Sequence, residues 1–411
     1  MSPHLTPKAR LDALLALVNS AAQEAIAVYE KTGDVPSPET AHALDNSRGS
    51  LGLRNARSYV QYEPACLNVV IRSNIAGILA WHPEGSPIAD IAKQAGIQSD
   101  KLGRILSFLA TKHCFKEVSQ GVFANNRLSS QLIPGTPVAD VCLLVAGSSM
   151  KGADSLYAWL TDSAYGLSEG PAPSPFIYAI KEEGRTDLFD WLKHNPEWNT
   201  VFASGMIGMG EVSGDADMLV QTYPFADLGD NATFCDIGGG LGHMCMEVVK
   251  VHPNIHATLQ DQPAVVEQSK QHCESEFPLA IQCNRMSFEP IDFFKEAPIK
   301  DQDIYYLRHV VHDWSDSDAV VILKNIRTAM KPESRVLIRQ YHSIVKAPEP
   351  LLANYGAGNI FPYYQDMNMM NYMNSKERSL DEFKALGAAA GLEFVKEWDF
   401  AVNGMVEFRI A

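Results

Sequence analysis

The sequence predicts an α/β protein: a doubly wound sheet in the carboxyl-terminal part, preceded by a mostly helical domain with a small wing. Strand-like and helix-like segments alternate from about Ala232 onward. A glycine-rich run, residues 238–242, separates the first strand of that alternation from its first helix. The chain of 411 residues is too long for one ordinary core, so we expect two domains.

Composition narrows the class of ligand. Apolar residues make up 46% and charged residues 20%, as in ordinary globular proteins. No stretch approaches the roughly 18 uninterrupted apolar residues that a membrane span needs. A net charge of −15 argues against a nucleic-acid partner. The seven cysteines form no C-x-x-C pair, which favours reduced thiols in the cytoplasm. We expect a small-molecule partner.

The amino-terminal region, residues 1–57, is predicted to hold one helix and a linker. Apolar positions recur at helical spacing over residues 8–31, and Asp12 interrupts the apolar run, so an amphipathic helix fits better than a signal peptide. A polar linker rich in Pro, Ser, Asn and Gly continues to about Leu53. The sequence assigns no role to this extension.

Residues 58–137 read as a winged-helix-like module. Helical segments are expected over residues 67–81, 86–97 and 99–111, followed by a hairpin that turns at residues 119–121. Ser86 and Ser99 are the expected N-caps, and Gly96 the expected helix stop. A winged helix suggests DNA binding, but the acidic net charge and the lack of a Lys/Arg-rich recognition helix argue against that function. A packing or dimerisation module is the simpler expectation.

Residues 138–225 are predicted to be a helical connector. Its many aromatic residues should be mostly core, although such a density between two domains also suits the lining of an apolar substrate pocket. These aromatic residues are Tyr157, Trp159, Tyr165, Phe176, Tyr178, Phe189, Trp191 and Trp198.

Residues 226–411 carry the α/β alternation. After residue 343 comes a long insertion, whose residues 354–373 we interpret as a loop that shapes a pocket, then one more helix and a last pair of strands. In this fold, ligands bind at the carboxyl ends of the strands. Strands are expected at residues 233–239, 256–261, 302–310 and 335–343, and helices at residues 243–252, 264–276, 316–330 and 379–392.

The glycine-rich run is the first candidate site. Glycines let the backbone turn sharply and approach a ligand closely. Gly238 and Gly240 fit the dinucleotide pattern G-x-G-x-x-G, but His243 stands at its third glycine. The spacing D-x-G-x-G-x-G, from Asp236 to Gly242, is instead the pattern of class I methyltransferases. It predicts S-adenosyl-L-methionine as cofactor, with Asp236 near its ammonium group.

Acidic residues at the next two strand ends extend this site. Asp261 ends the following strand, where a carboxylate can accept both ribose hydroxyls; a helix N-cap before Pro263 is the alternative. Asp292 is placed to accept a hydrogen bond from an adenine amino group while Phe293 covers the ring. The alternative is that Asp292 is an ordinary loop residue and Phe293 a core residue, as in most Asp–Phe pairs.

The segment from Leu307 to Asp316, LRHVVHDWSD, is the candidate chemical site because it lies between a strand and a helix at the same edge. The methyl group of a sulfonium is already activated, so an enzyme must chiefly align it and deprotonate the acceptor. A phenol has a pKa of about 10 and a histidine of about 6.5, so His312 suits a general base.

In these motifs, the chain resembles the plant-type and fungal class I S-adenosylmethionine-dependent O-methyltransferases. That group includes caffeic acid and flavonoid O-methyltransferases and many fungal secondary-metabolite enzymes. The resemblance covers the chain from about Glu63 and rests on DIGGGLG, LQDQP, IDFF, LRHVVHDWSD and SKERSLDEF. It implies a Rossmann-like class I methyltransferase domain behind a winged-helix dimerisation domain, and a homodimer. No metal is expected, because no His/Cys/Asp cluster in the sequence has ligand spacing.

The resemblance also implies roles for single residues. His312 would be the base, with Glu377 and Glu407 flanking its ring to hold one tautomer and support the imidazolium. A helix-start charge is the alternative for Glu377, and an ordinary acidic residue in a terminal strand is the alternative for Glu407.

The family further suggests that Phe189, Trp198 and Met206 contact the cofactor or the acceptor. Packing in the core explains Phe189 and Trp198 equally well. Two positions depart from the family. Arg308, a cofactor-binding candidate, stands where Lys is frequent, and Gly210 stands where a serine often follows Met206 by four residues.

The sequence therefore predicts methyl transfer to a phenolic hydroxyl of a small aromatic compound. Two other functions stay open: a catalytically inactive, cofactor-binding winged-helix regulator, and N- or C-methylation on the same fold. The identity of the acceptor does not follow from these motifs.

Overall fold

The computed structural model describes residues 59–168, 173–181, 184–340, 360–400 and 403–411, with isolated positions before residue 59. The chain divides into two compact units, Met1–Tyr62 and Glu63–Ala411. Described positions in the first predicted helix, such as Leu15 and Asn19, are helical, while the linker predicted after it lies outside the described residues. None of the helices in this described part is long and apolar enough to cross a bilayer. The finer boundaries at residues 57, 137 and 225 stay predictions.

The winged module has the expected helices and hairpin. The predicted helix over residues 67–81 is two helices, because Asn74 takes a left-handed conformation (φ 53°) between them. The wing is a three-stranded antiparallel sheet of order β1-β3-β2. The elements are α3 (Tyr62–Arg72), α4 (Ile75–Ala80), β1 (Ser86–Pro87), α5 (Ile88–Ala95), α6 (Ser99–Thr111), β2 (Lys116–Ser119) and β3 (Val122–Ala124).

Two of the three predicted helix ends in this module are wrong. Ser86 pairs with Phe123 in the sheet, so its backbone is extended and it caps no helix. Helix α6 is capped by Gln98, whose side chain accepts from the Lys101 N–H at 2.8 Å, one residue before the predicted Ser99. Gly96 ends α5 in the left-handed conformation, as predicted.

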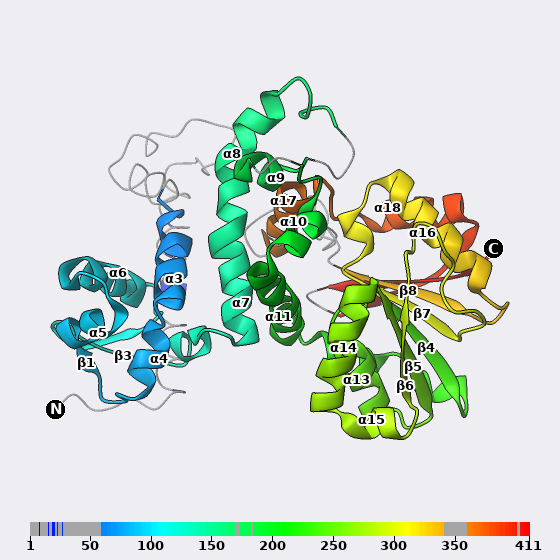
Figure 1. Ribbon diagram of the computed structural model, residues 1–411, viewed down its shortest axis with the longest axis horizontal. Helices are drawn as coiled ribbons and strands as arrows, with labels where there is room; N and C mark the ends of the chain where they lie inside the picture. The colour runs from blue at the N-terminus through cyan, green and yellow to red at the C-terminus, as the bar shows by residue number, and fades with distance from the viewer. Residues whose placement is uncertain are drawn as a thin grey trace. The chain divides into compact units, whose positions relative to one another are not determined.

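The connector is mainly helical, as predicted. Trp159, Phe176 and Trp191 are buried, whereas Tyr157 is 81% exposed. A single π-helical turn joins α7 to α8, which lie end to end in Figure 1. The elements are η2 (Ser129–Leu132), α7 (Pro137–Leu143), η3 (Leu144–Ser148), α8 (Ser149–Thr161), α9 (Pro175–Ile180), α10 (Leu188–His194), α11 (Pro196–Ser213), α12 (Asp215–Thr222) and η4 (Phe225–Leu228).

The carboxyl-terminal part is a seven-stranded sheet of order β6-β5-β4-β7-β8-β10-β9. The first five strands in this order, β6, β5, β4, β7 and β8, pair in parallel. Strand β10 is antiparallel to both β8 and β9. The α/β prediction is confirmed; β6, an edge strand that ends in Pro290, was not predicted. The strands are β4 (Ala232–Ile237), β5 (Ile255–Asp261), β6 (Met286–Pro290), β7 (Ile304–Arg308), β8 (Arg335–Gln340), β9 (Leu392–Asp399) and β10 (Gly404–Ile410).

Helices cover both faces of this sheet (Figure 1). Residues of α12 to α15 join the core on one face, which contains Phe234 and Tyr306, and those of α16 and α18 join the core on the other, with Val311 and Phe383. The chain runs from β4 to β5 on one side and later returns to β7 on the other, which makes the end of β4 a topological switch point. The helices are α13 (His243–Val251), α14 (Pro263–Glu276), α15 (Pro278–Gln282), η5 (Val311–Asp313), α16 (Asp316–Ala329), α17 (Ile360–Met373) and α18 (Leu380–Ala390).

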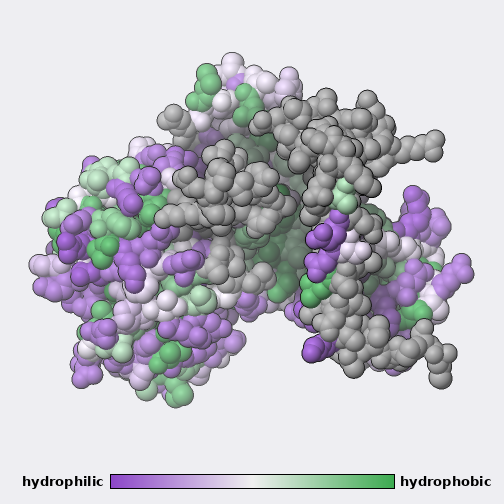
Figure 2. Space-filling model, turned by 180° about the vertical axis from the view of Figure 1, so that it is seen from behind, coloured by the Kyte–Doolittle hydropathy of each residue, from purple (hydrophilic) through white to green (hydrophobic). Residues whose placement is uncertain are grey.

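Helix α17 corrects one expectation. Residues 354–373 were interpreted as a loop, but Ile360–Met373 form a helix that packs against α8 and α9. Tyr372 of this helix donates to the Leu144 carbonyl at 2.8 Å from the buried interior. Residues 354–359 lie outside the described part. Elsewhere, the described surface is mostly hydrophilic, with scattered hydrophobic patches, on the face that Figure 2 shows.

Candidate active site

The glycine-rich run forms a tight loop between β4 and α13. Gly238, Gly240 and Gly242 all have positive φ, at 73°, 55° and 83°. A Cβ on Gly238 would lie 2.7 Å from Val310, whereas a Cβ on Gly240 would meet nothing within 4 Å. The loop is therefore a tight backbone turn that glycine adopts without strain, closed to a side chain at Gly238 and open at Gly240.

Two carboxylates face this loop. The Oδ2 atom of Asp261 accepts the Gly240 N–H at 3.0 Å, and its Oδ1 atom accepts the Gln262 N–H at 2.7 Å. Asp236, 1% exposed, lies beneath the loop, where the Cys245 thiol donates to it at 3.7 Å. The alternative of Asp261 as a helix cap gains no support, because α14 shows no side-chain cap.

Burial sets the ionisation of both acids. Burial raises the pKa of Asp236 to about 7, while the Arg308 guanidinium acts to lower it and Asp261 to raise it. Burial also raises the pKa of Asp261 to about 6, against the two backbone N–H groups that lower it. Two buried carboxylates beside one guanidinium make a site that favours a cationic or hydroxyl-bearing ligand.

Aromatic residues gather around Trp314, just before α16. Phe294 and Phe293 contact its ring edge-on, with centroids 4.7 and 6.1 Å away, and Phe189 of α10 stacks on it at 6.0 Å. Trp314 therefore contacts both Phe293, predicted to bind the cofactor, and Phe189, predicted to contact the cofactor or the acceptor. Asp292 is more exposed, and a hydrogen bond from Lys295 at 2.7 Å lowers its pKa.

The candidate base lies in the turn after β7. His312 is 3% exposed, and its Nδ1 atom lies 2.7 Å from Oε1 of Glu377. Its Nε2 atom lies 3.6 Å from Oδ1 of Asp313, and the His309 ring stacks on it with centroids 5.2 Å apart. The Oε2 atom of Glu377 is buried with no hydrogen-bond partner among the described residues.

This pairing makes His312 a stronger base than an isolated buried histidine. Burial alone would lower its pKa, but the charge and hydrogen bond of Glu377, helped by Asp313, raise it above the usual 6.5. Burial also raises the pKa of Asp313 to about 7, although the His312 charge lowers it. The geometry fits a neutral imidazole with its proton on Nδ1 and a basic Nε2.

Sequence reasoning missed the residue that holds this turn in place. Arg378 is fully buried; its guanidinium donates to the carbonyls of Val311 at 2.8 Å and Trp314 at 2.7 Å, and its Nε donates to Asp316 at 2.8 Å. Ser375 also donates to the Trp314 carbonyl, at 3.0 Å. The available signal was the SKERS motif itself, which supplies Ser375 and Arg378 besides the predicted Glu377.

Glu407 corrects a second expectation, because its carboxylate is engaged elsewhere. It accepts from Trp398 Nε1 at 2.9 Å and lies 3.3 Å from Arg335 Nε. In β10 it pairs with Leu337 and points to the face that carries Tyr223, whereas the His312 turn packs on the other face. The expected contact between Glu407 and the imidazole is therefore not formed.

Gln340 is a buried polar residue near the histidine turn that the sequence analysis did not single out. It ends β8, is fully buried, and its amide atoms have no hydrogen-bond partner among the described residues. The adjacent Arg339 carbonyl accepts the His309 N–H at 3.0 Å, which ties this strand end to the histidine turn. A polar residue at a strand end was the only sequence signal for it.

The remaining predicted residues have distinct surroundings. Arg308 ends β7, and its guanidinium lies against Gly210 of α11. Met206 is one helical turn before Gly210 on α11. Trp198 contacts the Trp191 ring, and the Arg72 Cζ atom lies 5.1 Å from the centroid of the Trp198 ring. These contacts favour a packing role for Trp198.

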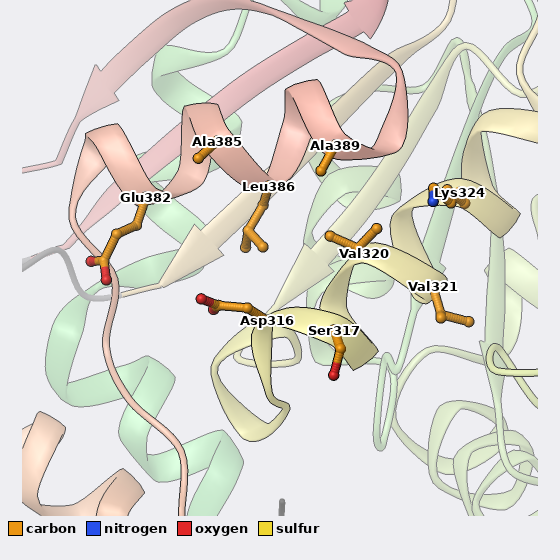
Figure 3. A pocket seen from close by; sticks show the side chains of 9 residues that line it. All are labelled: Asp316, Ser317, Val320, Val321, Lys324, Glu382, Ala385, Leu386 and Ala389. Atoms are coloured by element: carbon orange, nitrogen blue, oxygen red, sulfur yellow. The ribbon is translucent and has the colours of Figure 1, made fainter. Parts of the chain in front are cut away.

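A surface groove lies apart from these residues. Figure 3 shows it between α16 and α18, lined by apolar side chains such as Val320, Leu386 and Ala389. Among the residues that line the groove, Asp316 of α16 accepts a hydrogen bond from Arg378, which also holds the turn that carries His312. Within the described ranges, no group of three His, Cys, Asp or Glu side chains is arranged to hold a metal ion.

Comparisons with known proteins agree with this geometry. A family model described as an O-methyltransferase domain matches residues 166–393. The chain is 37% identical to 3-O-methyltransferase 2 of Phanerochaete chrysosporium over 99% of each protein. The structure of the mitomycin 7-O-methyltransferase MmcR has a TM-score of 0.74 and 25% identity, covering 88% of this chain and 98% of that one. LepI bound to SAH and a substrate analogue, at 20% identity, TM-score 0.75 and coverage of 99% and 100%, shows the shared fold alone.

Proposed function

The chain belongs to the S-adenosylmethionine-dependent O-methyltransferases, and on that premise we propose that it methylates a phenolic hydroxyl of a small aromatic compound with His312 as general base. The observation that carries the proposal is the 2.7 Å contact between His312 Nδ1 and the buried Glu377 carboxylate. That contact leaves Nε2 as the nitrogen available to an acceptor.

The residues around the glycine loop fit the cofactor. A positively charged sulfonium and ammonium suit two buried carboxylates, and the open space at Gly240 suits close approach of a ligand to the backbone. We assign Asp236 to the ammonium group, directly or through water, Asp261 to the ribose hydroxyls, and Asp292 with Phe293 to the adenine. When bound, S-adenosylmethionine supplies an activated methyl group.

His312 accounts for the remaining chemistry. Its Nε2 atom takes the phenolic proton as the hydroxyl oxygen becomes the nucleophile, and Glu377 stabilises the imidazolium that results. Asp313, 3.6 Å from Nε2, adds to that stabilisation. Phe189, beside Trp314, and Met206 are the proposed contacts of the acceptor ring, since a thioether packs well on an aromatic face.

A panel assay with methyl-labelled cofactor tests the reaction class. Phenols, hydroxybenzoates and flavonoids should accept label on oxygen, whereas matched anilines and methyl ethers of the same rings should not. Label on nitrogen or carbon alone would replace O-methylation by another transfer. Cofactor binding without transfer to any acceptor would favour the inactive regulator.

Replacing Asp261 with alanine is expected to weaken S-adenosylhomocysteine binding about tenfold to a hundredfold, because hydrogen bonds to a charged group are worth about 1.5–3 kcal/mol. Isothermal titration calorimetry measures this. Asp261→Asn keeps the shape and one acceptor oxygen, and Asp381→Ala, whose side chain is 94% exposed on α18, is the control. Unchanged affinity in Asp261→Ala would remove this residue from the ribose site.

The pH dependence of methyl transfer tests the pairing of His312 with Glu377. A base with a raised pKa is lost as pH falls through that pKa, so kcat/KM declines on the acidic side. Glu377→Gln removes the charge that raises the His312 pKa, and the acidic midpoint should move to lower pH. Asp313→Asn should move it the same way by less. An unmoved midpoint in Glu377→Gln argues that another group controls the acidic limb.

We also propose a cytoplasmic homodimer that dimerises through residues 58–137. All seven cysteines are unpaired in the structure, which suits a reducing compartment. Light scattering on the full chain should give twice the mass of one subunit.

A further inference from the structure

The two positions that depart from the family pattern meet in space. Arg308 ends β7, and Gly210 lies in the fourth turn of α11. A Cβ built on Gly210 would lie 2.7 Å from Nη2 and 3.3 Å from Cζ of Arg308. Because ordinary contacts between such atoms are about 3.5–4 Å, any side chain at position 210 would compete with the guanidinium for space.

The other glycines of α11 serve a different purpose. A Cβ on Gly208 would lie 2.2 Å from the Pro137 carbonyl oxygen, and one on Gly205 would lie 2.7 Å from the Leu144 side chain. Both allow α11 to approach α7 and the turn after it. Of the glycines described in α11, Gly210 alone faces a charged group, so helix packing does not explain it.

The guanidinium that Gly210 admits belongs to the cofactor site. Asp236 pairs with Tyr306 across β4 and β7, and Arg308 follows two residues later, so alternation directs both charged side chains to the same sheet face. The positive charge of Arg308 favours the ionised form of Asp236. The pair presents one anion and one cation, which is the complement of a zwitterionic amino acid.

We propose that Gly210 is a positioning residue that leaves room for the Arg308 guanidinium beside Asp236, so that this pair binds the amino-acid end of the cofactor. Asp236 takes the ammonium group and Arg308 the carboxylate, for which a planar guanidinium offers two parallel donors. Glycine in place of the frequent serine at 210 makes room for the larger arginine in place of lysine at 308. We call this pair of changes the exchange. The inference rests on the proposed placement of the cofactor at the glycine loop.

A double-mutant cycle in the full chain tests this exchange. Gly210→Ser, Arg308→Lys and the double variant are compared by calorimetric affinity for S-adenosylhomocysteine and by urea unfolding without ligand. Gly210→Ser should weaken binding about tenfold or more when Arg308 is present, and less than about threefold in the Arg308→Lys background, because a coupled pair is not additive. Gly210→Ala replaces Gly210→Ser if the serine variant does not fold.

Gly208→Ala, alone and with Arg308→Lys, is the matched control. Its effect on binding and on unfolding should be the same factor in both backgrounds, since its obstacle is the Pro137 carbonyl. If Gly210→Ser weakens binding by equal factors with and without the Arg308→Lys change, the exchange is wrong. Coupling in unfolding without coupling in affinity overturns the binding role. A wild-type chain that binds no S-adenosylhomocysteine would instead refute the proposed function.

Discussion

Replacement of His312 by alanine should lower kcat/KM for a hydroxyaromatic acceptor by a factor of about 10²–10⁴, or about 3–5.5 kcal/mol. The loss follows because the variant has no group at Nε2 to take the phenolic proton, while Glu377 is left with a buried charge and no imidazole. S-adenosylhomocysteine affinity should stay within about twofold, because no part of the glycine loop contacts His312 by hydrogen bond among the described residues.

The comparison needs a histidine of similar chemistry outside the site. His82 is exposed in the turn after α4, and His82→Ala should leave kcat/KM within about twofold. Nearly full activity of His312→Ala with normal cofactor binding would show that the imidazole is not the base. A rate that rises with pH in His312→Ala, as free phenolate accumulates, would support the assignment.

Replacement of Arg378 by methionine should lower the free energy of unfolding by about 2–4 kcal/mol, with at least a tenfold loss of kcat. Methionine fills similar volume but leaves the Val311 and Trp314 carbonyls without these donors. The ion pair contributes little to this figure, because Asp316 is 57% exposed and screened by water. The rate falls because the freed turn no longer holds His312 against Glu377. Urea unfolding and steady-state kinetics measure both effects.

Lys376→Met is the matched control for this change. Lys376 comes from the same segment and pairs with Glu382 at 2.7 Å, but its side chain is 44% exposed. Its loss should cost less than about 1 kcal/mol, as for other surface ion pairs. Equal losses in the two variants would mean that general charge on this segment, rather than the carbonyl contacts of Arg378, stabilises the histidine turn.

Much of the fold follows from local pattern. The alternation of apolar strands with amphipathic helices after Ala232 predicted four strands of the sheet and its terminal pair, because each element carries its own periodicity. The loops at their ends were predictable for the same reason, and with them the positions of Asp236, Asp261 and His312. Helix caps such as Ser86 were not, because a competing strand pairing took the residue.

The sequence by itself determined which residues lie at the carboxyl-terminal edge of the parallel strands, since the order of strands along the chain and the turn residues after each strand are local properties. Only the tertiary structure decided which distant side chains meet there. Sheet pairing turned Glu407 away from His312, the fold brought Arg378 onto the histidine turn, and α11 brought Gly210 against Arg308. Such contacts depend on strand register and helix packing between segments far apart in the chain, which no local periodicity encodes.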